Sequence, residues 1–355
     1  MLIWRSFTHW IGGMGVLVFI LCLLPLTGGY HMNLMKAESP GPSVSKLVPK
    51  VQSTAKILYT IYIILTIVEI IFLLIGKMPL FDTLCLSFGT AGTGGFGIKN
   101  DSIASYSTYN QVVITVFMIL FGINFNAYYL LLTKKVMQAA KNEEVRYYLG
   151  IIGLAIVAIA INTREMFTSF GRAFQQAAFQ VGSIITTTGY ATTDFNVWPV
   201  FSKTILVILM FVGACAGSTG GGIKVSRLLI LCKSARKELQ LYLHPNAVKK
   251  IKMDDKAIPH EVVRATNMFL FVYIMIFVTS LLIISLDNLD MVSNFTAIAA
   301  TLNNIGPGLG AVGPTGNFNT YSYISKAVMI FDMLAGRLEV FPLLLLFKRD
   351  TWRKF

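Results

Sequence analysis

Three short stretches combine threonine or asparagine with glycine inside an otherwise apolar chain. They read TAGTGGFG at 90–97, TTTGYAT at 186–192 and LNNIGPGLG at 302–310. Glycine reaches positive φ at little cost, so successive carbonyls can turn toward one axis. Threonine adds a hydroxyl oxygen without adding a full charge. Because such oxygens can replace the hydration shell of a monovalent cation, these residue types predict a site that a dehydrated cation enters and leaves.

We therefore predict a selectivity filter built from turns at 90–94, 187–190 and 304–308. Its predicted cation-coordinating residues are Thr90, Ala91, Gly92, Thr187, Thr188, Gly189, Asn304, Ile305 and Gly306. A helix that ends just before each turn would point the negative end of its dipole, about −0.5 charge, at the site. The alternative, tight turns between buried helices, fits one such stretch better than it fits three.

The composition indicates that these turns lie within a membrane. Of the 355 residues, 55% are hydrophobic and only 13% are charged, whereas soluble domains carry about 25% charged residues. A helix that crosses a bilayer needs roughly 20 apolar residues. Seven candidate crossings lie near 9–27, 57–76, 109–133, 147–162, 200–232 (interrupted), 264–286 and 324–347.

A shorter amphipathic segment precedes each of the three turns, at 78–89, 167–185 and 290–301. These segments are too short to span, so we expect re-entrant half-helices that dip into the membrane and turn back. Backbone that leaves a helix inside a membrane is tolerated only when it is buried in protein or lines a water-filled path. The predicted fold is all-α and transmembrane, with repeated helix–pore-helix–helix units around a pseudo-fourfold ion pathway.

The order of crossing, half-helix, turn and crossing divides the chain into repeats. We expect a second repeat at 51–140, a third at 141–256 and a fourth at 257–355. Gly92, Gly189 and Gly306 are separated by 97 and 117 residues. Extending this period backward puts a further turn before Met1, so residues 1–50 are expected to be the second helix and cytoplasmic loop of a truncated first repeat.

The distribution of positive charge along the chain indicates its membrane topology. The net charge is +13, and 22 of the 30 lysines and arginines fall in four segments, at 36–56, 134–146, 224–264 and 348–354. Loops rich in lysine and arginine that alternate with loops poor in these residues are typical of the positive-inside rule. This pattern predicts an external N-terminus and a cytoplasmic C-terminus, and it argues against nucleic acid as a partner. The basic segment 233–256 fits either a solvated cytoplasmic face or a docking site for a cytosolic regulator.

A gate is predicted where glycines interrupt a crossing. GACAGSTGGG at 213–222 contains five glycines, and each costs a helix about 1 kcal/mol relative to alanine. We expect a flexible intramembrane loop below the filter that obstructs the path. Close helix packing through small residues is the alternative. The predicted gate residues are Gly217, Ser218, Thr219, Gly220, Gly221, Gly222 and Arg337.

Three further polar residues lie within apolar runs. A charge such as Arg337 inside a membrane is a functional candidate by default, and we expect it to face the pore just inside the filter. An ion pair with Asp332, Glu339 or Glu69 is the alternative. For Asn124 and Asn126, cavity lining and interhelical hydrogen bonding fit equally well.

Several motifs together resemble one family. TAGTGGF, TTTGYAT and NNIGPGLG occur in this order, with WIGGMGVLV, INFNAYY, CAGSTGGGIKVSR and GRLEVFP elsewhere in the chain. The combination resembles the Trk/Ktr/HKT superfamily of potassium uptake proteins, most closely its TrkH-like branch, over essentially the whole chain. The resemblance implies K⁺ as the ion at the filter, a homodimer in the bacterial inner membrane, and a separate cytosolic nucleotide-binding regulatory subunit. It also supports the gating roles of the glycine loop and Arg337.

The expected function is therefore K⁺ uptake across the plasma membrane, by a protein that is not an enzyme and binds no cofactor beyond the transported ion. The scattered cysteines and histidines argue against a zinc site or a disulfide framework. One alternative is K⁺ symport with Na⁺ or H⁺, for which Glu69 is a candidate carboxylate. The other is a non-conducting homologue that only assembles with full-length subunits.

Overall fold

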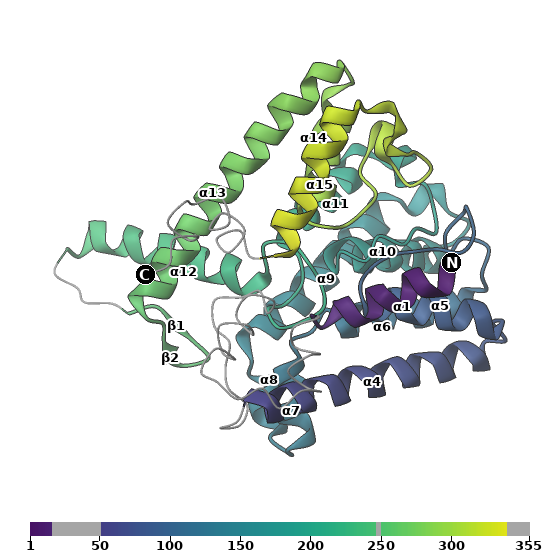
Figure 1. The fold of residues 1–355 in the computed structure, drawn as a ribbon. Coiled ribbons are helices and arrows are strands. Elements are labelled where there is room, and N and C mark those ends of the chain that lie inside the picture. The colour runs from purple at the N-terminus through teal and green to yellow at the C-terminus, as the bar shows by residue number, and fades with distance from the viewer. Residues whose placement is uncertain (16–50, 246–249, 339–355) are drawn as a thin grey trace, which may run out of the picture.

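The computed structural model describes residues 1–15, 51–245 and 250–338, and its regular structure there is almost entirely helical (Figure 1). A short antiparallel ribbon pairs β1 (Lys252–Met253) with β2 (Lys256–Ala257). The α-helices are α1 (Leu2–Gly13), α4 (Val51–Ile75), α5 (Leu80–Ala91), α6 (Thr108–Phe121), α7 (Phe125–Leu132), α8 (Val136–Ala140), α9 (Glu143–Asn162), α10 (Phe170–Ile185), α11 (Val200–Val212), α12 (Val225–Leu243), α13 (His260–Ile284), α14 (Met291–Leu302) and α15 (Tyr323–Arg337).

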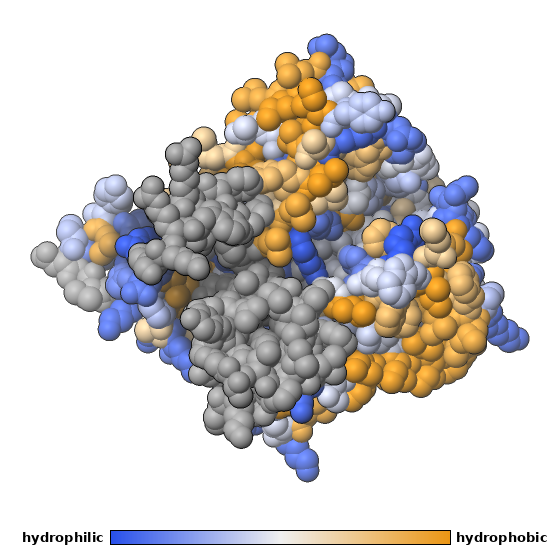
Figure 2. All heavy atoms as spheres, in the orientation of Figure 1, coloured by the Kyte–Doolittle hydropathy of each residue, from blue (hydrophilic) through white to orange (hydrophobic). Residues whose placement is uncertain are grey.

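Three helices among the described residues are individually long and apolar enough to cross a membrane. They cover Thr54–Ile75, Glu143–Asn162 and His260–Asp287. Many large apolar side chains on them point outward, including Ile64 and Phe271, which are 50% and 59% exposed. Hydrophobic residues cover the surface over α13 to α15 and along the edge formed by α4 (Figure 2). This outward apolar surface is what a lipid-facing helix needs, and the all-α membrane fold is confirmed.

The crossing predicted at 109–133 is bent instead of straight. α6 ends at Phe121 and α7 begins at Phe125, and the two helices meet at 90°. Backbone groups at the bend bond to the loop that follows α11: Cys215 N donates to the Gly122 carbonyl at 3.1 Å, and Phe125 N donates to the Gly217 carbonyl at 3.0 Å. The break is tolerated because protein backbone satisfies the groups that the helix releases.

Three short helices precede the predicted turns. α5, α10 and α14 have 12, 16 and 12 residues, so none is long enough to span a bilayer. Their positions match the half-helices predicted at 78–89, 167–185 and 290–301. Asp290 caps α14, because its carboxylate accepts from Ser293 N at 2.9 Å. The Ser293 hydroxyl and backbone N–H stabilise the charged form and hold the pKa of Asp290 below its usual range.

The order of long helix, short helix, turn and helix occurs three times: α4–α5–α6, α9–α10–α11 and α13–α14–α15. One buried apolar cluster gathers around the first unit, and a larger one joins the other two. α11 ends at Val212 and α12 begins at Val225, which leaves a break inside the crossing predicted at 200–232. The parts of predicted crossings at 16–27 and 339–347, like most of the segment 1–50, lie outside the described residues.

Candidate ion pathway

The turns after α5, α10 and α14 share one unusual backbone conformation. In each, the second residue past the helix has φ near +57°, and a glycine with positive φ follows two positions later. The pairs are Thr93 (57°) and Gly95 (62°), Thr187 (58°) and Gly189 (86°), and Asn304 (56°) and Gly306 (109°). Positive φ is a genuine outlier for a β-branched residue such as threonine. Backbone strain of this kind gathers at functional sites.

Hydrogen bonds fix the same register in all three turns. The amide of the first positive-φ residue donates to a carbonyl in the last helical turn, three residues earlier. These bonds are Thr93 N to Thr90 O (3.0 Å), Thr187 N to Ile184 O (3.0 Å) and Asn304 N to Thr301 O (3.1 Å). The three segments are therefore equivalent in structure, although their sequences share little beyond the final glycine.

The first turn begins three residues later than the sequence predicted. Thr90 and Ala91 belong to α5, and Gly92 has an ordinary helical φ of −76°. The Thr90 hydroxyl donates back to the Leu86 carbonyl at 2.9 Å, as a helical threonine does. The residues equivalent to Thr187, Thr188 and Gly189 are thus Thr93, Gly94 and Gly95. The error arose because TAGTGG offers two Thr-x-Gly triplets, and only the second has positive φ.

The three turns lie side by side in chain order. A Cβ added to Gly95 would collide with the Thr188 carbonyl oxygen, and one added to Gly189 would collide with the Ile305 carbonyl oxygen. Glycine is needed at both positions because each is packed against the middle carbonyl of the next turn. A Cβ added to Gly306 would meet none of the described residues within 4 Å.

The turns border a common cavity of about 680 Å³. Thr93, Thr187 and Asn304, the three equivalent positive-φ residues, all line it. α1 contributes His9 to its wall, and α15 contributes Arg337. Within the described ranges, no group of three or more histidine, cysteine or acidic side chains could hold a metal ion. What the cavity offers a cation at the turns is neutral oxygen.

The loop between α11 and α12 bonds directly to two of the turns. The Thr219 carbonyl accepts from the Thr93 hydroxyl at 2.9 Å, and Gly221 N donates to the Thr187 hydroxyl at 2.6 Å. Gly213, Gly217 and Gly222 have positive φ, so the backbone leaves the helical conformation, as the glycine-rich sequence predicted. We call residues 213–222 the gate loop, after the role that the sequence predicts for them.

Arg337 connects the gate loop to two helices. Its Nη1 donates to the Thr219 carbonyl at 3.0 Å, and its Nη2 donates to the Gly12 and Gly13 carbonyls at 2.8 and 3.1 Å. The guanidinium therefore links the C-terminal end of α15 with α1 and the gate loop at the cavity wall. Of its predicted alternative partners, Asp332 accepts from the Ser280 hydroxyl at 2.8 Å, and Glu339 lies outside the described residues.

Glu144 bonds to Ala216 in the gate loop and to Ser226 in the first turn of α12, although sequence reasoning did not select it. Its side chain is 2% exposed. Oε1 accepts from Ala216 N at 2.6 Å and from Ser226 N at 3.1 Å, while Oε2 accepts from Asn124 Nδ2 at 3.3 Å. The available signal was a carboxylate at the start of an apolar crossing, where burial requires partners.

Asn124 and Asn126 lie at the bend between α6 and α7. The Asn124 carbonyl oxygen caps α7 by accepting from Asn126 N at 2.9 Å, and its amide bonds to Glu144. Neither is among the residues that line the cavity at the turns. Asn124 therefore matches the alternative, hydrogen bonding between helices.

Lys224 is a second gate-loop contact that the sequence did not reveal. It is 1% exposed, has φ of 81°, and its ammonium donates to the Gly220 carbonyl. The lysine folds back over the glycine run that precedes it. A single lysine between glycines and an apolar helix was the only sequence signal available.

Comparison with known proteins supports this architecture. The TrkH family model, described as cation transport protein, matches residues 1–160 and 148–353. The Trk system potassium uptake protein TrkH of Salmonella typhimurium is 37% identical over 358 residues, which is 99% of this chain and 74% of that protein. The chain belongs to the TrkH family. As a TrkH-family protein it is a multi-pass membrane transporter and not an enzyme.

A solved relative extends the match to three dimensions. The crystal structure of the potassium transporter TrkH from Vibrio parahaemolyticus superimposes with a TM-score of 0.84 at 36% identity, covering 99% of this chain and 73% of that one. The curated TrkH sequence of the same organism is 39% identical over 360 residues, with 99% and 74% coverage. The described part of the chain therefore has the TrkH-family fold.

Proposed function

We propose that this TrkH-family chain carries K⁺ into the cell through a selectivity filter formed by the three turns. The observation that supports this most is the shared conformation of Thr93–Gly95, Thr187–Gly189 and Asn304–Gly306 around one cavity. K⁺ selectivity in proteins arises where backbone carbonyls replace the hydration shell of the ion. The named relatives are potassium uptake proteins.

The electrostatics of the turns suit a cation that must leave again. Thr187 and Thr188 are each 1% exposed and supply hydroxyl and carbonyl oxygens without a full charge. The C-terminal ends of α5, α10 and α14 lead into the turns, and each adds the negative end of a helix dipole, about −0.5 charge. Partial charges attract the ion, whereas a carboxylate at the same place would hold it too tightly for rapid release.

The gate loop is proposed to close the path beneath the filter. Opening it requires separating Thr219 from Thr93 and Arg337, and Gly221 from Thr187. Each such hydrogen bond contributes about 0.5–1.5 kcal/mol to the stability of the closed conformation, and up to about 3 kcal/mol when one partner is charged. A few kcal/mol is a barrier that a regulatory subunit could overcome. The positive charge of Arg337 adds an electrostatic barrier to cations while the loop is closed.

The assembly follows from the resemblance and from charge placement. The chain is proposed to form a homodimer in the bacterial inner membrane, with its C-terminus in the cytoplasm and a cytosolic nucleotide-binding subunit as regulator. The lysine- and arginine-rich segments, including the one that contains the β1–β2 ribbon, would all face the cytoplasm.

The test is ion flux through purified protein. The purified protein would be reconstituted in liposomes, and uptake of radioactive rubidium and sodium would be measured side by side. The proposal predicts rubidium uptake that potassium competes with and sodium does not. Equal uptake of both ions would contradict the filter, and no uptake would favour a non-conducting homologue.

One observation favours a second candidate, cation-coupled symport. Glu69 in α4 is fully buried, and an acidic side chain inside a membrane is a candidate for proton or sodium coupling. Symport predicts that an imposed proton or sodium gradient drives rubidium accumulation and that Glu69→Gln abolishes the coupling. Rubidium movement that follows only its own electrochemical gradient, with or without Glu69→Gln, would exclude this candidate.

A further inference from the structure

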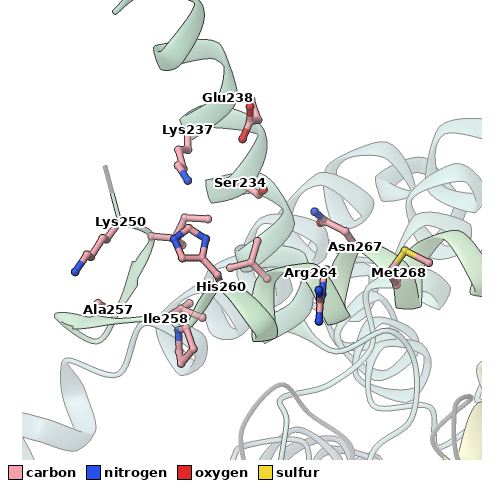
Figure 3. A pocket seen from close by; sticks show the side chains of 13 residues that line it. Ser234, Lys237, Glu238, Lys250, Ala257, Ile258, His260, Arg264, Asn267 and Met268 are labelled. Atoms are coloured by element: carbon pink, nitrogen blue, oxygen red, sulfur yellow. The ribbon is translucent and has the colours of Figure 1, made fainter. Parts of the chain in front are cut away.

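A basic pocket lies away from the ion pathway, between α12, the β1–β2 ribbon and the start of α13 (Figure 3). Its volume is about 460 Å³. Lys237, Lys250, His260 and Arg264 line it, and Glu238 is the one acidic residue in its wall. Among the residues that the structure describes, neither lysine nor Arg264 forms a salt bridge. Three lysine or arginine side chains and one carboxylate therefore line the pocket, which gives its described wall a net positive charge.

The pocket lies at a membrane boundary. The apolar span of α13 covers His260–Asp287, and the part of the pocket wall that α13 supplies, from His260 to Met268, lies in the first turns of this span. Basic side chains at the end of a spanning helix lie at the level of lipid headgroups. The charge is thus placed where phosphates of the bilayer are found.

An apolar groove continues from the pocket along the same face of α13. The pocket is lined by His260, Val263, Arg264, Asn267 and Met268 of this helix. A groove of about 720 Å³ is lined by Phe271, Val272, Met275, Ile276, Thr279 and Ile283 among others, with α15 as its second wall. These positions follow one another at intervals of three or four residues, which places them on one face of a helix. Pocket and groove are two parts of one stripe.

We propose that this stripe binds an anionic phospholipid, with the phosphate in the basic pocket and an acyl chain in the groove. Basic pockets between membrane helices bind anionic headgroups, and charge-assisted hydrogen bonds from lysine and arginine suit phosphate oxygens. One leaflet is about 15 Å deep, or about ten residues of helix. An acyl chain that starts beside Arg264 therefore passes Phe271 and Val272 and ends near Met275.

The proposed ligand joins two features that a simpler ligand would not use together. A soluble phosphate would contact the basic residues and leave the groove empty. A zwitterionic lipid would fill the groove but bring a positive group to the basic residues. α12 begins shortly after the gate loop, and its later turns reach the pocket. The bound lipid would therefore restrain the C-terminal part of α12, which is the part farther along the chain from the gate loop.

The experiment is lipid titration of the purified, delipidated full-length protein, read by native mass spectrometry. Phosphatidylglycerol and phosphatidylcholine with identical acyl chains are compared. The test variant combines Lys237→Gln with Arg264→Gln. The control combines Arg236→Gln with Lys256→Gln, which removes the same charge from residues of α12 and the ribbon that do not line the pocket. Gel filtration checks that all variants remain folded.

The parent and control proteins should prefer phosphatidylglycerol, and the test variant should bind it about 25-fold more weakly, since each basic side chain contributes about fivefold. Equal retention of both lipids by the parent, or equal losses in test and control variants, would overturn the proposal. So would inorganic phosphate that displaces the lipid at equimolar concentration. A change of oligomeric state without lipid retention would identify the stripe as an interface between copies instead. None of these readings depends on ion flux.

Discussion

Arg337 donates from Nη1 to the Thr219 carbonyl oxygen at 3.0 Å, although 118 residues separate the two in sequence. The same oxygen accepts from the Thr93 hydroxyl, so one gate-loop carbonyl is bonded to a turn of the proposed filter and to a charged residue of α15. A loop anchored in this way cannot leave the path without releasing both groups. This relationship couples the proposed gate to the proposed filter.

Replacing Arg337 should open the path. Arg337→Gln removes the positive charge and weakens the bonds to Thr219 and Gly12, so we expect basal rubidium uptake to rise several-fold. Lys326→Gln is the control, because Lys326 also lines the cavity but bonds to the Asn319 carbonyl, away from the gate loop. Lower uptake by Arg337→Gln at equal membrane abundance would mean that Arg337 supports the open state.

The acceptor oxygens of Glu144 should stabilise the closed conformation of the gate loop. Glu144→Ala leaves the amides of Ala216 and Ser226 without this partner, at about 1–3 kcal/mol for each buried donor. We expect a lower thermal midpoint and a higher basal flux. Glu144→Gln retains one oxygen that can accept from both amides, so it should lie closer to the parent in both measurements. Identical behaviour of the two variants would show that the charge, not the acceptor geometry, is what matters.

The register of the first turn can be tested with two isosteric changes. Thr93→Val removes the hydroxyl that bonds to Thr219 in the turn, whereas Thr90→Val removes one that bonds within α5. Thr93→Val should increase basal rubidium flux, and Thr90→Val should leave flux and ion preference near those of the parent. The opposite ranking in the same uptake assay would restore the register predicted from the sequence.

Much of this architecture follows from residue pattern, for identifiable reasons. Apolar length predicted α4, α9 and α13, and glycine beside threonine or asparagine predicted the turns after α10 and α14 in the correct register. The turn after α5 was misplaced because TAGTGG contains two candidate triplets, and local sequence does not say which one adopts positive φ. Contacts such as Thr93 with Thr219 join residues 126 positions apart. No local periodicity encodes them.

The bend at Asn124 and the contacts of Glu144 were not predicted from the sequence, and the reason is the same for both. Each depends on a partner in the gate loop, Phe125 N with the Gly217 carbonyl at the bend and Glu144 with Ala216 N. The sequence analysis marked only Asn124, as a polar residue in an apolar run, and did not select Glu144. Only the folded chain shows which backbone groups those side chains and amides satisfy.

The most direct test of the central claim is the ratio of rubidium to sodium uptake in Gly189→Ser. Gly189 has φ of 86° and is packed against the Ile305 carbonyl, so an added Cβ must displace two turns of the proposed filter. Gly182→Ser is the control, because a Cβ there meets its nearest neighbour, Ile119, at an ordinary 3.5 Å. The account predicts that Gly189→Ser loses most of its preference for rubidium while Gly182→Ser keeps it. An unchanged ratio in Gly189→Ser, with the protein folded and conducting, would contradict the filter assignment.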